Sequence, residues 1–214
     1  MKKMINLILS TLLFVVFIFV GSVVAATSQS TTTVGFYRSD HTKGIANEGP
    51  KHLATHGYSY NIYADASVSQ FISALANKDV IFVNSHGSAG MITLSTSSSV
   101  TGNQIVASSF LSNAELVYLS TCQTGMHSNT NGNFCSALVN KGVDTVVAFT
   151  QNITASTDTD GIHRFNSIVV YKLICGYSVY DALETAKIQI YSESMRYWGA
   201  DSYVIYGSRT TVIN

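Results

Sequence analysis

Short apolar runs that alternate with segments of helical periodicity constrain this chain of 214 residues more than any other feature. The runs at residues 80–83 and 116–119 are continuous, as expected of strands buried on both faces, and residues 143–149 predict a further strand. Between the predicted strands lie a polar loop that carries Pro50 and helix-like stretches such as residues 67–77, 105–111 and 134–140, in which apolar residues recur at helical spacing. This alternation predicts an α/β fold, with a mostly parallel sheet of about six strands and helices on both faces.

Residues 1–26 are predicted to be a secretory signal peptide. Lys2 and Lys3 precede an apolar run that extends to about Val20, and residues 24–26 offer small side chains for cleavage. A retained membrane anchor is the alternative, because the apolar stretch with its flanks reaches about 20 residues, the length of a span. We therefore expect a secreted protein, in contact with a membrane only if this segment is kept.

The rest of the chain has the length of one domain. Residues 27–33 are almost entirely Ser, Thr and Gln, which predicts a short flexible lead-in, and residues 34–214 can bury one sizeable core. The chain has 12 basic and 12 acidic side chains, and two of the basic ones, Lys2 and Lys3, belong to the signal peptide. No cluster of Lys and Arg occurs, which argues against nucleic-acid binding.

The chain has three cysteines, Cys122, Cys135 and Cys175, so at least one thiol has no partner within the chain. If two of them pair, a Cys135–Cys175 disulfide is the expected one, and secretion would permit it. Otherwise we expect both to be small buried side chains, as free cysteines commonly are.

Two of the predicted strands run directly into a reactive side chain. Residues 80–85 lead into His86, and residues 116–121 lead into Cys122. The carboxyl ends of neighbouring parallel strands converge on one edge of the sheet, where an imidazole can take the proton of a thiol. Cys122 is therefore the candidate nucleophile and His86 the candidate general base. A buried, unreactive cysteine is the alternative, against which the polar, turn-forming residues around Cys122 argue.

The motifs around these two residues resemble those of a known family. Residues 85–87 (Ser-His-Gly) and 119–125 (Leu-Ser-Thr-Cys-Gln-Thr-Gly) are similar to the histidine and cysteine motifs of the caspase-like (clan CD) cysteine peptidases. The likeness is greatest to the CHAT branch, whose cysteine motif reads roughly Leu-Ser-Ala-Cys-Glu-Thr-Gly. Residues 137–148, 171–186 and 203–207 also resemble the helices and strands that follow in that branch.

The resemblance implies a three-layer α/β/α caspase-like fold and a thiol protease that hydrolyses a protein or peptide substrate with no cofactor or metal. It also implies that the amides of Gly87 and Cys122 form the oxyanion hole, while His86 transfers the protons. The remaining histidines show no metal-ligand spacing with each other or with the cysteines.

Substrate preference is predicted from acidic side chains. Relatives that cleave after basic residues carry an acidic group in the first pocket, and Asp158 and Asp160 lie near the position of an aspartate in the CHAT pattern. Asp40 is a second possibility, and capping of the following helix is the alternative role of Asp158 and Asp160. Ser120 occupies the position at which caspases carry an aspartate-binding glutamine. It is therefore a substrate-binding candidate, and a caspase-type preference is not expected.

The chain departs from the family after Phe149, where residues 150–152 (Thr-Gln-Asn) replace the usual tryptophan. The loop beside the substrate pocket is therefore expected to be built differently.

Two other functions remain open. A sortase-like transpeptidase is one, because residues 119–122 resemble the sortase Thr-Leu-x-Thr-Cys pattern. That class is an all-β barrel and needs an arginine soon after the cysteine, whereas the first arginine after Cys122 is Arg164. A non-catalytic binding or regulatory module of the caspase-like fold is the other, against which the intact His86 and Cys122 argue.

Overall fold

The computed structural model describes residues 32–39, 44–153, 162–192 and 199–213. In chain order the elements are β1 (Thr32–Tyr37), α2 (Gly44–Ala54), β2 (Ser59–Ala64), α3 (Val68–Asn77), β3 (Val80–Asn84), β4 (Gly87–Ser88), β5 (Met91–Thr93), β6 (Ser99–Thr101), α4 (Gly102–Ala107), β7 (Leu116–Ser120), α5 (Phe134–Asn140), β8 (Thr145–Phe149), α6 (Ile162–Ile174), α7 (Val179–Ser192), η1 (Ala200–Ser202) and β9 (Tyr203–Gly207).

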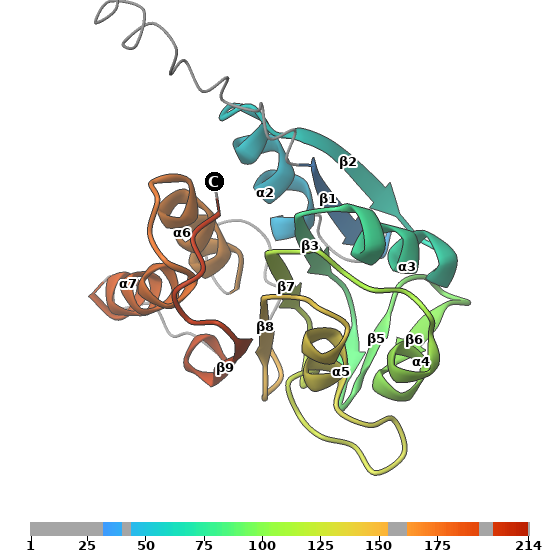
Figure 1. Cartoon of the computed structure of the whole chain (residues 1–214). Helices are drawn as coiled ribbons and strands as arrows, with labels where there is room; N and C mark the ends of the chain where they lie inside the picture. The colour runs from blue at the N-terminus through green and yellow to red at the C-terminus, as the bar shows by residue number, and fades with distance from the viewer. Residues whose placement is uncertain (1–31, 40–43, 154–161, 193–198, 214) are drawn as a thin grey trace, which may run out of the picture. The chain divides into compact units, whose positions relative to one another are not determined.

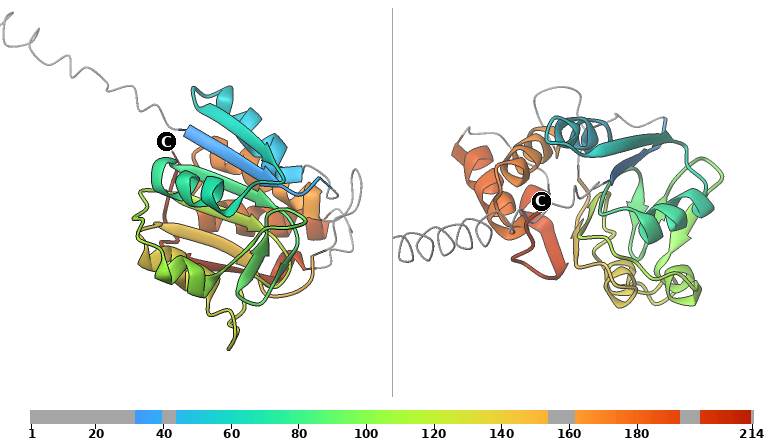
Figure 2. Two further views of the ribbon diagram at one scale, coloured as in Figure 1. Left: turned by 90° about the vertical axis from the view of Figure 1, so that its right-hand side faces the viewer. Right: turned by 45° about the horizontal axis from the view of Figure 1, so that its top comes forward.

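A six-stranded sheet with the order β2-β1-β3-β7-β8-β9 forms the middle layer. Its strands are parallel except for β9, which runs antiparallel to β8 at one edge. Helices α2, α6 and α7 cover one face, and α3, α4 and α5 cover the other (Figures 1 and 2). A small antiparallel sheet, β4-β5-β6, follows β3. The predicted α/β fold with a mostly parallel six-stranded sheet is confirmed.

The central strands contribute to two separate cores. In β3, Val80 and Phe82 pack into the core on the α2 and α6 face, whereas Ile81 and Val83 pack into the core on the α3 and α5 face. Strand β7 repeats the pattern, and every residue of both strands is buried. Burial on both faces explains why these runs are continuously apolar.

Helix α2 lies where the sequence predicts a polar loop around Pro50, so that prediction is wrong. Proline has no N–H, so the carbonyl of Ala46, four residues earlier, receives no helical hydrogen bond from it. This carbonyl lies against Gly35 of β1, where an added Cβ would overlap it. The buried side chains of Ile45 and Leu53 pack α2 onto the sheet. Their spacing of eight residues was the signal for the helix.

The apolar residues of the sequence predict a helix over residues 105–111, whereas α4 begins earlier, at Gly102, and ends earlier, at Ala107. Thr101 and Gln104 form a capping box that starts the helix at Gly102. The N–H of Ser108 closes it by donating to the carbonyls of Gln104 and Ile105. Helix boundaries here follow the caps and not the last apolar side chain.

None of the three cysteines, all of which are among the described residues, forms a disulfide. Cys135 is buried in α5, while Cys175 follows α6 on the other face of the sheet and is exposed. The Cys135–Cys175 bridge, which was one of the two alternatives, does not form, and the expectation of burial holds only for Cys135. Burial raises the pKa of the Cys135 thiol to about 12, so this thiol is not reactive at neutral pH.

Gly35→Ala is expected to lower the free energy of unfolding by about 3 kcal/mol, because its methyl group would overlap a backbone carbonyl that moves only with α2. Gly57→Ala is the control: no atom lies within 4 Å, but φ is +93°. A left-handed conformation alone costs about 1–2 kcal/mol. Urea denaturation of both variants measures the difference, and an equal loss at the two positions would contradict the close approach of α2 to β1.

Candidate active site

The register of β3 and β7 brings the two predicted reactive residues to the same level of the sheet. Asn84 and Ser120 are the last partners of this parallel ladder, and the N–H of Ser85 donates to the carbonyl of Ser120 at 3.4 Å. His86 and Cys122 each follow two residues beyond this pair. Since neighbouring strands lie about 4.8 Å apart, the two residues leave the sheet side by side.

Gly87 packs against the turn that contains Cys122. A Cβ built on Gly87 would lie 2.7 Å from the carbonyl oxygen of Cys122 and 2.9 Å from Cβ of Thr121, so only glycine fits there. The N–H of Thr93 in β5 donates to the carbonyl of His86 at 2.9 Å. The small sheet thus fixes the backbone around His86, whose side chain is exposed.

The turn after β7 is held by side-chain hydroxyls and contains a strained residue. The hydroxyl of Thr121 donates to that of Thr124 at 2.7 Å, and both threonines are buried. Gln123 has φ of +55°, in the left-handed region that residues other than glycine seldom adopt. Such strain persists only where the surrounding bonds hold it, and it is concentrated at functional sites.

The thiol of Cys122 is half-buried and points toward the segment that follows β8. Its Sγ lies 3.6 Å from the carbonyl oxygen of Ile153, and the N–H of Gln123 donates to the carbonyl of Gln151 at 3.1 Å. These residues belong to the segment in which the sequence departs from the caspase-like pattern. The departure therefore borders the candidate nucleophile.

A chain of three buried polar side chains lies beneath the turn, on the α6 face of the sheet. The hydroxyl of Tyr118 donates to Oδ1 of Asn166 at 2.7 Å, and Nδ2 of Asn166 donates to the hydroxyl oxygen of Ser120 at 2.9 Å. Tyr118 and Ser120 lie two residues apart on one face of β7, and Cys122 follows at the same interval. We refer to these three side chains as the Tyr118–Asn166–Ser120 chain.

The sequence matches the CHAT domain family over residues 36–208, which is most of the chain. The chain belongs to the CHAT domain family. The fold is similar to that of the Arg-specific cysteine proteinase gingipain R, with a TM-score of 0.56 and 14% identity. The alignment covers 86% of this chain but 47% of the gingipain chain, so this CHAT domain spans about half of that length. No curated protein matches the sequence. The family and fold that the motifs imply are thus confirmed.

This CHAT domain brings together His86, Gly87 and Cys122, which sequence reasoning singled out. Their roles as base, oxyanion-hole residue and nucleophile remain predictions, because the geometry shows proximity and not reaction. Among the described residues, no group of three or more His, Cys, Asp or Glu side chains could hold a metal ion.

The predicted substrate-binding residues are placed differently from one another. Ser120 is 1% exposed, and its hydroxyl accepts the hydrogen bond from Asn166, so a contact with substrate stays a prediction. Asp158, Asp160 and Asp40 lie outside the described residues.

Asn166 and His163 are residues near the site that the sequence analysis did not select. Asn166 follows Ile162 and Phe165 at the spacing of the buried face of α6, so a polar residue at an apolar position was the available signal. His163 lies where α2 begins: a Cβ on Gly44 would be 2.5 Å from its Nδ1. The same Cβ would lie 2.7 Å from Nδ2 of Asn84, the residue that pairs with Ser120.

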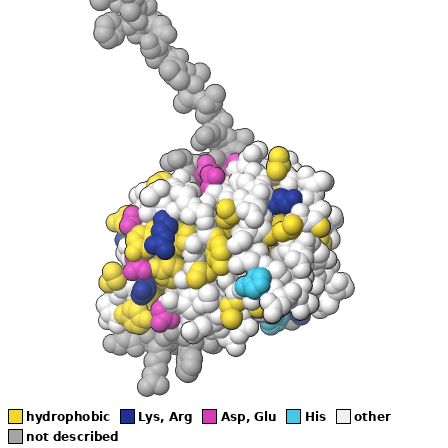
Figure 3. Space-filling view, turned by 60° about the horizontal axis from the view of Figure 1, so that its bottom comes forward, with side chains coloured by type: hydrophobic (Ala, Val, Ile, Leu, Met, Phe, Trp, Pro, Cys, Tyr) yellow, Lys and Arg dark blue, Asp and Glu magenta, His cyan; other side chains and the backbone are white. Residues whose placement is uncertain are grey.

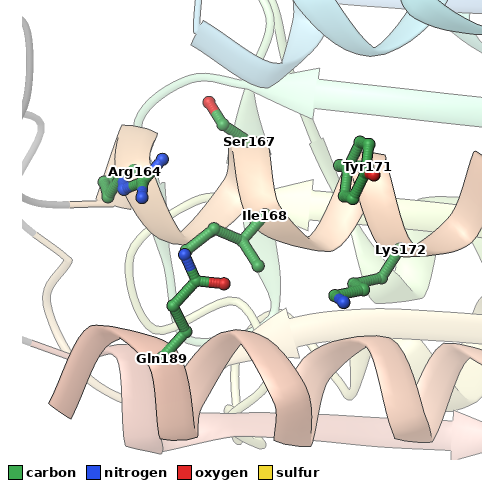
Figure 4. A pocket seen from close by; sticks show the side chains of 6 residues that line it. All are labelled: Arg164, Ser167, Ile168, Tyr171, Lys172 and Gln189. Carbon is green, nitrogen blue, oxygen red and sulfur yellow. The ribbon is translucent and has the colours of Figure 1, made fainter. Parts of the chain in front are cut away.

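A pocket of about 190 Å³ lies between α6 and α7 and is lined by Arg164, Ser167, Ile168, Tyr171, Lys172 and Gln189 (Figure 4). None of these residues belongs to the segments that carry His86 and Cys122, so this pocket is not the candidate active site. On the face shown in Figure 3, most charged side chains, of both signs, gather with hydrophobic ones on one side. The electrostatic potential of that face is therefore not of a single sign.

His163 is expected to make stability depend on pH, because burial lowers the pKa of its imidazole below the ordinary value of about 6.5. The unfolded chain therefore binds this proton more readily than the folded one. The stability that the folded protein gains from a neutral His163 is complete above about pH 6.5, and it is lost as the pH falls toward the lower pKa of the folded state. Urea midpoints of the wild type should fall between pH 7.5 and pH 5.5, and those of His163→Gln should fall less. An identical fall in both proteins would contradict this origin.

Proposed function

We propose that this CHAT domain is a cysteine endopeptidase with a Cys122–His86 dyad. The observation that carries the proposal is the β3–β7 register, which ends at Asn84 and Ser120 and sets His86 beside Cys122. Membership of the CHAT family and the gingipain-like fold support a protease-like module. The packing of Gly87 against the Cys122 carbonyl brings the two proposed oxyanion-hole residues together.

In the proposed reaction, His86 takes the proton of Cys122 and the thiolate sulfur attacks the peptide carbonyl carbon. The carbonyl oxygen becomes an oxyanion, which the amides of Gly87 and Cys122 stabilise. The C–N bond then breaks, and His86 gives its proton to the leaving amine. Water, deprotonated by His86, attacks the resulting thioester and releases the acid product together with the thiol.

A non-catalytic module of the same fold is the second candidate. The observation in its favour is a hydrogen bond from the Cys122 thiol to the carbonyl oxygen of Ile153, at 3.6 Å. This bond occupies the thiol that should attack the substrate. The sortase-like alternative is wrong, because that class is an all-β barrel and this chain has a mostly parallel sheet between two helical layers.

Secretion through a signal peptide at residues 1–26 is part of the proposal, and the order of basic, apolar and small residues supports it. That segment lies outside the described residues. Within the described ranges, no helix is long and apolar enough to cross a membrane.

Cys122→Ala is expected to abolish both labelling by a peptide electrophile and cleavage of a peptide library at neutral pH under reducing conditions. His86→Ala should lower the cleavage rate by about 10²- to 10⁴-fold, the usual contribution of a general base. Cys175→Ala is the matched control, since it removes an exposed thiol that directly follows α6, outside the segments that carry His86 and Cys122, and it should leave cleavage unchanged. Labelling that does not depend on Cys122, together with no cleavage, would favour the non-catalytic module.

We also propose cleavage after basic residues, with Asp158 and Asp160 as the acidic groups. A charge-assisted hydrogen bond contributes about 1.5–3 kcal/mol. Asp158→Asn or Asp160→Asn should therefore lower kcat/KM at least about 10-fold for a peptide with arginine before the cut, and little for its alanine counterpart. Asp144→Asn, an exposed change at the start of β8, is the control. If the aspartates only cap α6, both peptides should lose activity equally.

A further inference from the structure

Asn166 is the polar member of an otherwise apolar helix face. It is 1% exposed on α6, and its neighbours on that face, such as Phe165 and Val169, are fully buried. A buried amide without hydrogen bonds would cost the fold several kcal/mol, so its partners matter. Both ends of this amide bond to one strand, β7, at Tyr118 and Ser120.

Strand β7 loses its backbone support at the point where Asn166 contacts it. Its pairing with β8 ends at Tyr118 and Val147, two residues before β7 itself ends. On the other side, the last bond to β3, from Ser85 to Ser120, is long at 3.4 Å. Ser120 therefore leaves the sheet with no partner in β8 and with a long bond to Ser85, and the amide of Asn166 adds a side-chain bond at this point.

The turn after β7 bonds again to the end of β8 and to the segment that follows β8. The N–H groups of Gln123 and Gly125 donate to the carbonyls of Gln151 and Phe149, at 3.1 and 2.9 Å. Cys122 thus lies at the gap between the two strands. Its position depends on Ser120 before it and on these bonds after it.

We propose that Asn166 is a positioning residue, which holds Ser120 through its amide and thereby fixes Cys122 relative to His86. This inference rests on the proposed function of Cys122 and His86 as a dyad. Tyr118 has a supporting part: its hydroxyl donates to Oδ1 of Asn166 and so turns Nδ2 toward Ser120. A displacement of about 1 Å at a reacting group can cost about 100-fold in rate, so a single hydrogen bond at this gap is sufficient to matter.

The test uses the full domain with Cys175→Ser, so that Cys122 is the accessible thiol, since Cys135 is buried. Two rates are measured: alkylation of Cys122 by iodoacetamide, resolved by mass spectrometry, and peptide cleavage with kcat and KM separated. Asn166→Leu and Ser120→Ala should each lower kcat about 10- to 100-fold with KM changed less than about twofold. Both should change the alkylation rate, and Ser120→Thr, which keeps the hydroxyl, should restore both rates.

Thr145→Val is the matched control. Thr145 is fully buried at the opposite end of the sheet, where its hydroxyl donates to the carbonyl of Ser208 at 2.8 Å. This variant should lose stability, as Asn166→Leu does, yet keep both rates. The double variant Asn166→Leu/Ser120→Ala should lose no more rate than Asn166→Leu alone, because both changes remove the same bond.

Unchanged kcat and unchanged Cys122 alkylation in folded Asn166→Leu would overturn the proposal. If Asn166→Leu does not fold, equal rates in Ser120→Ala and Ser120→Thr would overturn it. A change in KM for Ser120→Ala with alkylation unchanged would instead make Ser120 a substrate contact and also overturn it. If the wild type cleaves no peptide, the proposed function fails, but the alkylation rates still decide whether Asn166 positions the thiol.

Discussion

The parallel pairing of β3 with β7 is the interaction on which the rest of the site depends. Each strand is buried on both faces, so a slip in register would carry apolar side chains to the wrong core on both sides of the sheet. The core therefore fixes the register, and the register fixes the level at which His86 and Cys122 leave the sheet. Two residues that are far apart in sequence are brought together by hydrophobic packing, with no direct bond between them required.

Much of the fold was predictable because the physical signals for it are local. Continuous apolar runs identified β3 and β7, and the helical spacing of apolar residues identified α3. Helix α2 was missed because a proline usually ends or kinks a helix, and α2 continues through Pro50. The carbonyl of Ala46 receives no helical hydrogen bond from Pro50. This carbonyl fits against Gly35 of β1, which has no side chain to exclude it.

The candidate site was predictable in part for the same reason. His86, Gly87 and Cys122 stand in contiguous motifs at strand ends, where topology alone brings them to one edge. Asn166 could not be assigned its partners from the sequence, because its two hydrogen bonds reach 46 and 48 residues along the chain. Long-range side-chain bonds of this kind leave no periodic trace, only a polar residue on an apolar helix face.

The bonds that connect the Cys122 turn to the end of β8 and to the segment after it affect how sequences of this family can change. They join backbone N–H and carbonyl groups, at Gln123 with Gln151 and at Gly125 with Phe149, and do not involve the side chains. Substitution in residues 150–152 can therefore alter what borders the thiol while the turn keeps its attachment. The buried strands β3 and β7 tolerate fewer substitutions, because a smaller side chain there leaves a cavity and a larger one causes a steric overlap. The surroundings of Cys122 can thus vary at this edge without refolding the sheet.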